Sequence, residues 1–128
     1  MKRLAVIVTL ILTGSMGFSQ SQADFMEAIT GFYPRLEGTE GETQTLAYVE
    51  SELERLEIPT REHSFREFDE GHSFSRVLEA RIEGEREDTI IVAAALNHRL
   101  DTPPERDGSV NIAALLELAR RLTEDAPE

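Results

Sequence analysis

Residues 89–96 read Thr-Ile-Ile-Val-Ala-Ala-Ala-Leu, and this run decides how the chain is expected to fold. It is nearly all apolar, which is typical of a central strand buried on both faces of a sheet. A loop with Pro103-Pro104 follows, and residues 109–122 then carry apolar side chains at helical spacing. A buried strand followed by a helix is half of a parallel α/β unit. The sequence therefore predicts an α/β fold with a mixed, mostly parallel sheet flanked by helices.

Two helices and two strands are expected before this run. Residues 24–33 predict a short helix that Pro34 ends, and residues 42–57 predict the clearest helix, with a Glu-rich face toward water. Residues 60–68 carry Phe65 and Phe68 among charged residues and predict a weak, edge-like strand, whereas residues 73–83 alternate apolar and polar side chains. A parallel unit needs a further strand after its helix. We therefore expect either the front of a larger α/β domain or a subunit that completes its sheet in another way, such as by pairing with a partner.

The N-terminus has the pattern of a secretory signal peptide. Lys2 and Arg3 precede an apolar run over residues 4–13, and Ser21-Gln22-Ala23 is an acceptable cleavage site. The apolar run is about half of the roughly 20 residues that a membrane-spanning helix needs. We therefore expect a signal peptide over residues 1–23, a single domain over residues 24–128, secretion or a periplasmic location, and no membrane association after cleavage.

Composition excludes several classes of protein. The 128-residue chain has a formal net charge of −12 and contains no Cys. A nucleic-acid-binding protein needs a basic face to neutralise phosphates, so no nucleic-acid partner is expected. Without Cys there are no disulfides, zinc fingers, iron–sulfur clusters or thiol nucleophiles.

Several ordered landmarks, taken together, point to a family of enzymes. They are Pro34-Arg35-x-x-Gly38-Thr39-x-Gly41, residues 76–84 (Arg-Val-Leu-Glu-Ala-Arg-Ile-Glu-Gly), Thr89-Ile90-Ile91-Val92, and Asp107-Gly108 followed by residues 112–120 (Ile-Ala-Ala-Leu-Leu-Glu-Leu-Ala-Arg). In this order they resemble the N-terminal half of the family-28 metallopeptidases, which are secreted co-catalytic zinc aminopeptidases. The resemblance implies an incomplete zinc-exopeptidase-like domain of the phosphorylase/hydrolase-like kind.

The resemblance also implies where metal ligands should lie. In that family the buried strand ends in His-x-Asp, and a later Asp bridges two zinc ions. Aligned on this pattern, Ala95 takes the place of the His, Asn97 takes the place of the Asp, and Asp107 falls on the bridging Asp. The remaining ligands belong to the family's second half. No cofactor is therefore expected for this chain, although the family binds zinc.

One rearranged metal site remains open. His98 lies three residues after Ala95, and a shifted strand end would bring His98 and Asp107 to one metal ion. A catalytic zinc normally has three protein ligands, so these two fall short. The alternative is that His98 is an ordinary loop histidine.

Other candidate residues have plainer interpretations. His63 and His72 are too sparse for a His-rich metal site and are expected at surface positions. Ser109 lacks the Gly-x-Ser-x-Gly pattern of a nucleophile elbow and is expected to be the N-cap of the last helix. The Glu-rich run over residues 50–57 is expected to be a solvated helix face, with a docking surface for a basic partner as the alternative.

Three functions follow from these observations. The first is an exported, zinc-aminopeptidase-like protein that does not catalyse hydrolysis and binds a peptide or protein partner. The second is a fragment of an active metal-dependent aminopeptidase whose other half lies outside these residues. The third is a small exported interaction module unrelated to peptidases.

Overall fold

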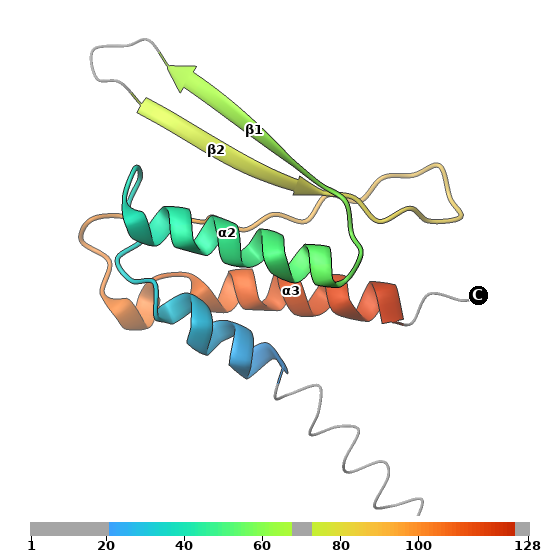
Figure 1. Ribbon diagram of the computed structural model, residues 1–128, viewed down its shortest axis with the longest axis horizontal. Helices are drawn as coiled ribbons and strands as arrows, with labels where there is room; N and C mark the ends of the chain where they lie inside the picture. The colour runs from blue at the N-terminus through green and yellow to red at the C-terminus, as the bar shows by residue number, and fades with distance from the viewer. Residues whose placement is uncertain (1–20, 68–72, 125–128) are drawn as a thin grey trace, which may run out of the picture.

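The computed structural model describes residues 21–67 and 73–124 (Figure 1). The helical segments lie side by side, and a β-hairpin lies over α2. The described elements, in chain order, are a helical segment over residues 21–30, α2 (Glu40–Arg55), β1 (Thr60–Glu67), β2 (Ser73–Ala80), the 3-10 turn η1 (Pro104–Arg106) and α3 (Ser109–Glu124). The mixture of helix and strand agrees with the predicted α/β class.

Some predictions concern residues outside this description. Residues 1–20 of the expected signal peptide, Phe68 and His72 are among them. Residues 21–23, at the expected cleavage site, are described and belong to the first helical segment. Within the described ranges, no helix combines the length and the apolar character needed to cross a membrane.

Helix α2 begins at a variant of the capping box, in which the Glu42 carboxylate reaches the residue before the N-cap. Thr39 is the N-cap, and its hydroxyl oxygen accepts a hydrogen bond from the Glu42 N–H at 3.4 Å. The Glu42 carboxylate turns back and accepts a hydrogen bond from the Gly38 N–H at 2.9 Å. Gly41 is required by a close approach, because a Cβ there would lie 2.1 Å from the Pro34 carbonyl oxygen. The helix is where the sequence predicts it, but it begins and ends two residues earlier.

One apolar cluster joins the helical segments. Its members come from the first helical segment, α2 and α3, together with Ile58, which follows α2. Leu78 of β2 and Leu96 pack against it from the hairpin side. The cluster therefore holds the helices together and fixes the hairpin over them. Its buried members are Phe25, Ile29, Leu53, Ile58, Ile112, Ala113, Leu116 and Ala119.

Strands β1 and β2 form an antiparallel hairpin whose register runs from Thr60↔Ala80 to Glu67↔Ser73. Leu78 faces the helices and packs on the core, whereas Phe65 and Val77 lie on the opposite face. Their side chains are 56% and 50% exposed. The hairpin therefore has one covered face and one open face.

The predicted mostly parallel sheet is not found in the described residues. The sheet there has two strands, and they are antiparallel. Residues 89–96, predicted to be a buried central strand, form no strand and are exposed over residues 89–93. The prediction followed the apolar run, but an apolar run becomes a buried strand only where neighbouring strands and helices cover it. The predicted strand over residues 73–83 also ends earlier, at Ala80, because its partner β1 begins at Thr60.

Candidate functional site

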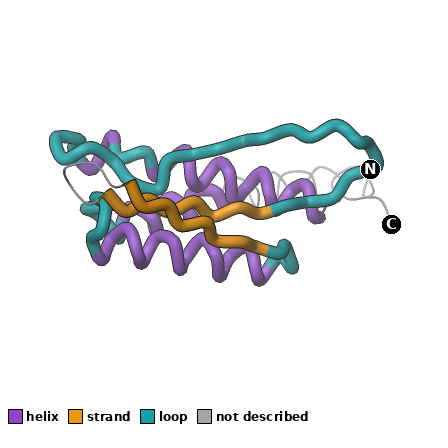
Figure 2. The backbone as a smooth tube through the Cα atoms, turned by 90° about the horizontal axis from the view of Figure 1, so that it is seen from above, coloured by secondary structure: helices purple, strands orange, loops and turns teal. Residues whose placement is uncertain are grey.

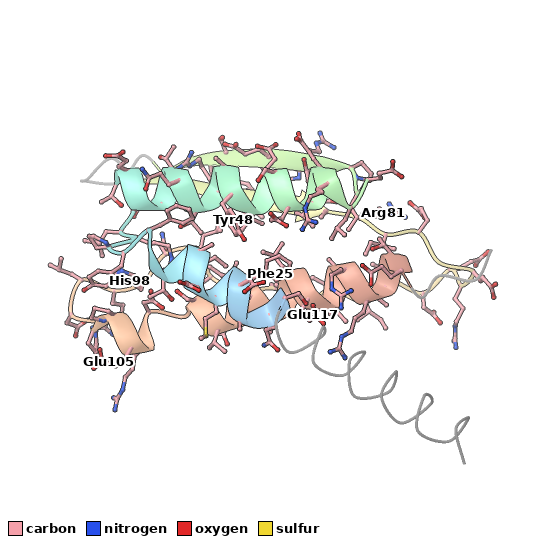
Figure 3. The ribbon with its side chains drawn as sticks, turned by 60° about the horizontal axis from the view of Figure 1, so that its bottom comes forward. Phe25, Tyr48, Arg81, His98, Glu105 and Glu117 are labelled. Atoms are coloured by element: carbon pink, nitrogen blue, oxygen red, sulfur yellow. The ribbon has the colours of Figure 1, made fainter. Side chains whose placement is uncertain are left out.

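The positions that the sequence analysis singled out lie around the loop that follows residues 89–95. Ala95 and Asn97 are exposed, His98 is half-buried, and Asp107 is buried with 5% of its surface exposed. His98 and Arg81 lie at opposite ends of the long axis of the molecule (Figure 3). The candidate site is therefore at the end of the molecule that also holds the first turn of α3.

Arg35 is the centre of this region and is completely buried. Its Nη1 donates to Asp107 Oδ2 at 2.7 Å, and its Nη2 donates to the Asp107 carbonyl oxygen at 2.6 Å. Nη1 also donates to Ser109 Oγ at 3.0 Å and to the Ile29 carbonyl oxygen at 3.3 Å, while Nε donates to the Leu96 carbonyl oxygen at 3.0 Å. The guanidinium therefore joins the first helical segment, the 96–98 loop and the start of α3.

Asp107 is the anion that balances Arg35. Its Oδ2 accepts from Arg35, and its Oδ1 accepts from the Ser109 N–H at 2.9 Å. Burial raises the pKa of Asp107, but the hydrogen bonds from Arg35 and Ser109 outweigh burial and hold that pKa below its ordinary value. Asp107 also caps α3, because it accepts from the first residue of that helix. The prediction that Ser109 is the N-cap is therefore wrong; Ser109 is the first helical residue.

His98 is bound to Arg35 in two ways. The His98 N–H donates to the Arg35 carbonyl oxygen at 3.0 Å, and His98 Nε2 accepts from the Arg35 N–H at 3.0 Å. Because Nε2 accepts, the ring proton lies on Nδ1, which donates to the Arg99 carbonyl oxygen at 2.8 Å. The Tyr33 ring stacks on the imidazole with a centroid distance of 5.1 Å. Both ring nitrogens of His98 are thus engaged in hydrogen bonds.

A second charged group holds the same loop from the α2 side. Glu42 is buried, and its Oε2 lies 3.3 Å from Arg76 Nη2. Glu42 Oε1 accepts a hydrogen bond from Asn97 Nδ2 at 3.4 Å. Arg76 Nε is buried and has no hydrogen-bond partner within the described residues. Asn97 therefore holds the loop against α2 and orients its amide toward a carboxylate.

These donors do not fit a metal ion as they are placed. Ala95 supplies no ligand atom, Asn97 directs its amide nitrogen to Glu42, and His98 has a hydrogen bond on each ring nitrogen. Both carboxylate oxygens of Asp107 accept hydrogen bonds. No group of three or more His, Asp or Glu side chains in the described ranges converges as a metal site. The assignment of His98 and Asp107 to one metal ion stays a prediction from sequence.

The remaining candidates have ordinary partners. His63 Nε2 lies 2.7 Å from Glu79 Oε2 across the hairpin. Ser109 Oγ accepts from Arg35, and His98 is directed to Arg35 and Arg99. Ser109 and His98 therefore do not form the nucleophile–base pair of a catalytic triad in this structure.

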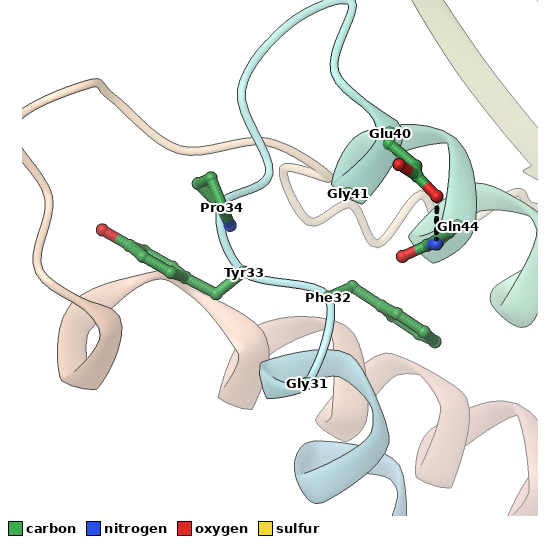
Figure 4. A pocket seen from close by; sticks show the side chains of 7 residues that line it. All are labelled: Gly31, Phe32, Tyr33, Pro34, Glu40, Gly41 and Gln44. Carbon is green, nitrogen blue, oxygen red and sulfur yellow. Dashed lines mark hydrogen bonds between the residues drawn. The ribbon is translucent and has the colours of Figure 1, made fainter.

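A shallow hollow lies beside the candidate site, next to the N-terminus of α2 (Figure 4). Phe32 and Tyr33 point to opposite sides of it, and Gln44 Nε2 donates to Glu40 Oε1 at 2.9 Å on its other wall. Gly41 forms its floor against the preceding turn. The polar side chains of its lining already have partners, because Glu40 and Gln44 bond to each other and Tyr33 Oη donates to the Thr102 carbonyl oxygen. The hollow therefore lacks the convergent groups of a ligand site.

No protein-family model matches the sequence, and no curated protein matches it significantly. Solved structures do resemble it in three dimensions. A Zn-dependent exopeptidase from Parabacteroides distasonis has a TM-score of 0.69 at 21% identity, and a glutaminyl cyclase from Fimbriiglobus ruber has 0.69 at 18%. A leucine aminopeptidase precursor from Bacteroides thetaiotaomicron has a TM-score of 0.61 at 19% identity. The chain has a metallopeptidase-like fold.

The likeness extends over only part of each of these proteins. The alignments cover 84%, 84% and 85% of this chain, but 42%, 41% and 43% of the exopeptidase, the cyclase and the aminopeptidase precursor. The chain therefore spans less than half the length of these structures. A shared fold does not fix a reaction, as a cyclase and two peptidases on this metallopeptidase-like fold illustrate.

Sequence reasoning missed the residue at the centre of the site. Arg35 was noted as part of a landmark, but its role was not predicted. The inward position of Glu42, which is buried against Arg76 and Asn97, was not predicted either. One signal was available for Glu42, because Thr39-x-x-Glu42 is a capping box. The pairing of Arg35 with Asp107 spans 72 residues and has no local signal.

Proposed function

We propose that this chain is a metallopeptidase-like domain of the family-28 kind that does not hydrolyse peptides by itself. The observation that carries the proposal is the burial of Asp107 against Arg35, with Oδ2 and Nη1 only 2.7 Å apart. In the family, the corresponding Asp bridges two cations. Here the guanidinium supplies the positive charge, and the carboxylate serves to hold three segments of the fold together.

The neighbouring positions support the same proposal. Metal-assisted hydrolysis needs at least three protein ligands and an open position at which water is activated. Ala95 cannot ligate, and the Asn97 amide is engaged with Glu42. His98 has no free nitrogen lone pair, because its Nε2 accepts from Arg35 and its Nδ1 carries the proton. Water activation therefore has no donor set among these residues.

A hydrolysis assay tests the proposal directly. The full chain is incubated with aminoacyl-nitroanilide substrates in the presence of Zn²⁺ or Co²⁺, beside the Asp107→Asn variant as a matched control. The expected result is no release of nitroaniline above the control. Chelator-sensitive turnover that the Asp107→Asn variant lacks would overturn the proposal.

Calorimetry with Zn²⁺ addresses the rearranged metal site. The expected result is no saturable heat, because every candidate ligand atom already has a hydrogen-bond partner. Binding that is lost in His98→Ala, with the circular dichroism spectrum of the chain unchanged, would establish the site predicted from sequence. His63→Ala is the control, since His63 lies on the hairpin and contacts Glu79.

A second candidate function is that these residues are part of an active metal-dependent aminopeptidase. It is favoured by the comparison in which the chain covers only 41–43% of three structures that include a zinc exopeptidase. The reading frame downstream of Glu128 discriminates the two. A Glu pair, an Asp and a His in the family's order would support an active enzyme, whereas a stop codon would support the non-catalytic chain.

We also propose that the protein is exported, with residues 1–23 removed as a signal peptide. The support is the basic start, the short apolar run and the cleavage pattern at Ser21-Gln22-Ala23. Mass spectrometry of the protein from the culture medium or periplasm tests this. A mature N-terminus at Asp24 is expected, and an intact N-terminus in the cytosol would contradict it.

A further inference from the structure

We draw no further inference here: the strongest candidate, the exposed apolar patch over residues 90–93 in the long loop between β2 and η1 (Figure 2), carries none because nothing in the structure shows what covers it.

Discussion

Arg35 and Ile90 show opposite degrees of burial. The Arg35 guanidinium is 0% exposed and donates to Asp107, Ser109, Ile29 and Leu96, whereas the Ile90 side chain is 88% exposed. The two regions meet at Leu96, whose carbonyl oxygen accepts from Arg35. The charged side chain of Arg35 is thus inside the protein, and the apolar side chain of Ile90 is outside.

The contrast separates a region whose polar groups are all paired within the domain from a segment whose side chains and backbone are uncovered. The buried pair of Arg35 and Asp107 needs no further group, because each nitrogen of the guanidinium and each oxygen of the carboxylate has a hydrogen-bond partner. The segment over residues 89–95 has apolar side chains and backbone groups that gain free energy only when another strand covers them. The following predictions, from the largest expected effect to the smallest, test this distinction.

Removing the buried anion should have the largest effect. Asp107→Ala leaves the Arg35 guanidinium buried without its counter-ion, which typically costs about 3–5 kcal/mol of unfolding free energy. Urea unfolding followed by circular dichroism measures the loss. The control is Asp101→Ala, since Asp101 forms an exposed ion pair with Arg99 and its loss should cost less than about 1 kcal/mol. Equal effects of the two substitutions would show that the Arg35 centre does not hold the fold together.

Acid should reduce the stability that a second buried carboxylate, Glu117, gives to the fold. Hydrogen bonds from Arg120 and Arg121, working against burial, lower the pKa of Glu117 from 4.5 to about 2. Because the folded-state pKa is depressed, the stabilisation is present above pH 4.5 and is lost as pH falls toward 2. Unfolding free energies measured across this window should fall less steeply in Glu117→Gln, which should itself cost about 2 kcal/mol at neutral pH. Identical slopes in both proteins would contradict the prediction.

Placing a carboxylate at residue 97, where the resembled family has one, should cost less. The Asn97 amide now donates a hydrogen bond to Glu42 Oε1 at 3.4 Å. In Asn97→Asp a carboxylate takes the place of this amide, so two negative charges lie close together. Arg76 offsets part of the repulsion, and residue 97 is exposed, so a loss of about 1 kcal/mol is expected at neutral pH. Repulsion raises the pKa of the new Asp, so the loss should shrink in mild acid. Asn97→Ser, which adds no charge, should show no such pH dependence.

Changes in the open segment should barely alter the stability of the chain alone. Ile90→Lys replaces an apolar side chain that is 88% exposed, so its unfolding free energy should stay within about 0.5 kcal/mol of the original. The substitution should also make the protein less prone to aggregate, because a charge on an open strand opposes pairing. Light scattering during storage measures this second effect. A loss as large as that of Asp107→Ala would mean that Ile90 is covered in solution.

Much of the local structure could be predicted from the sequence. The helical stripe of α2, the two strands of the hairpin and the helix after Asp107 follow from spacing that each segment carries within itself. The strand over residues 89–96 was predicted by the same reasoning and is not formed among the described residues. An apolar run indicates that a segment should be buried, but it does not provide the strands that would bury it.

The candidate site divides in the same way. That Ala95 and Asn97 take the places of the His and the Asp of the resembled family is a prediction from residue order alone. That Arg35 pairs with Asp107 across 72 positions, and that Glu42 turns inward to Arg76 and Asn97, was decided only by the packed arrangement of the segments. The physical reason is that periodicity and capping act over a few residues, whereas buried charges find their partners through space once the chain has folded.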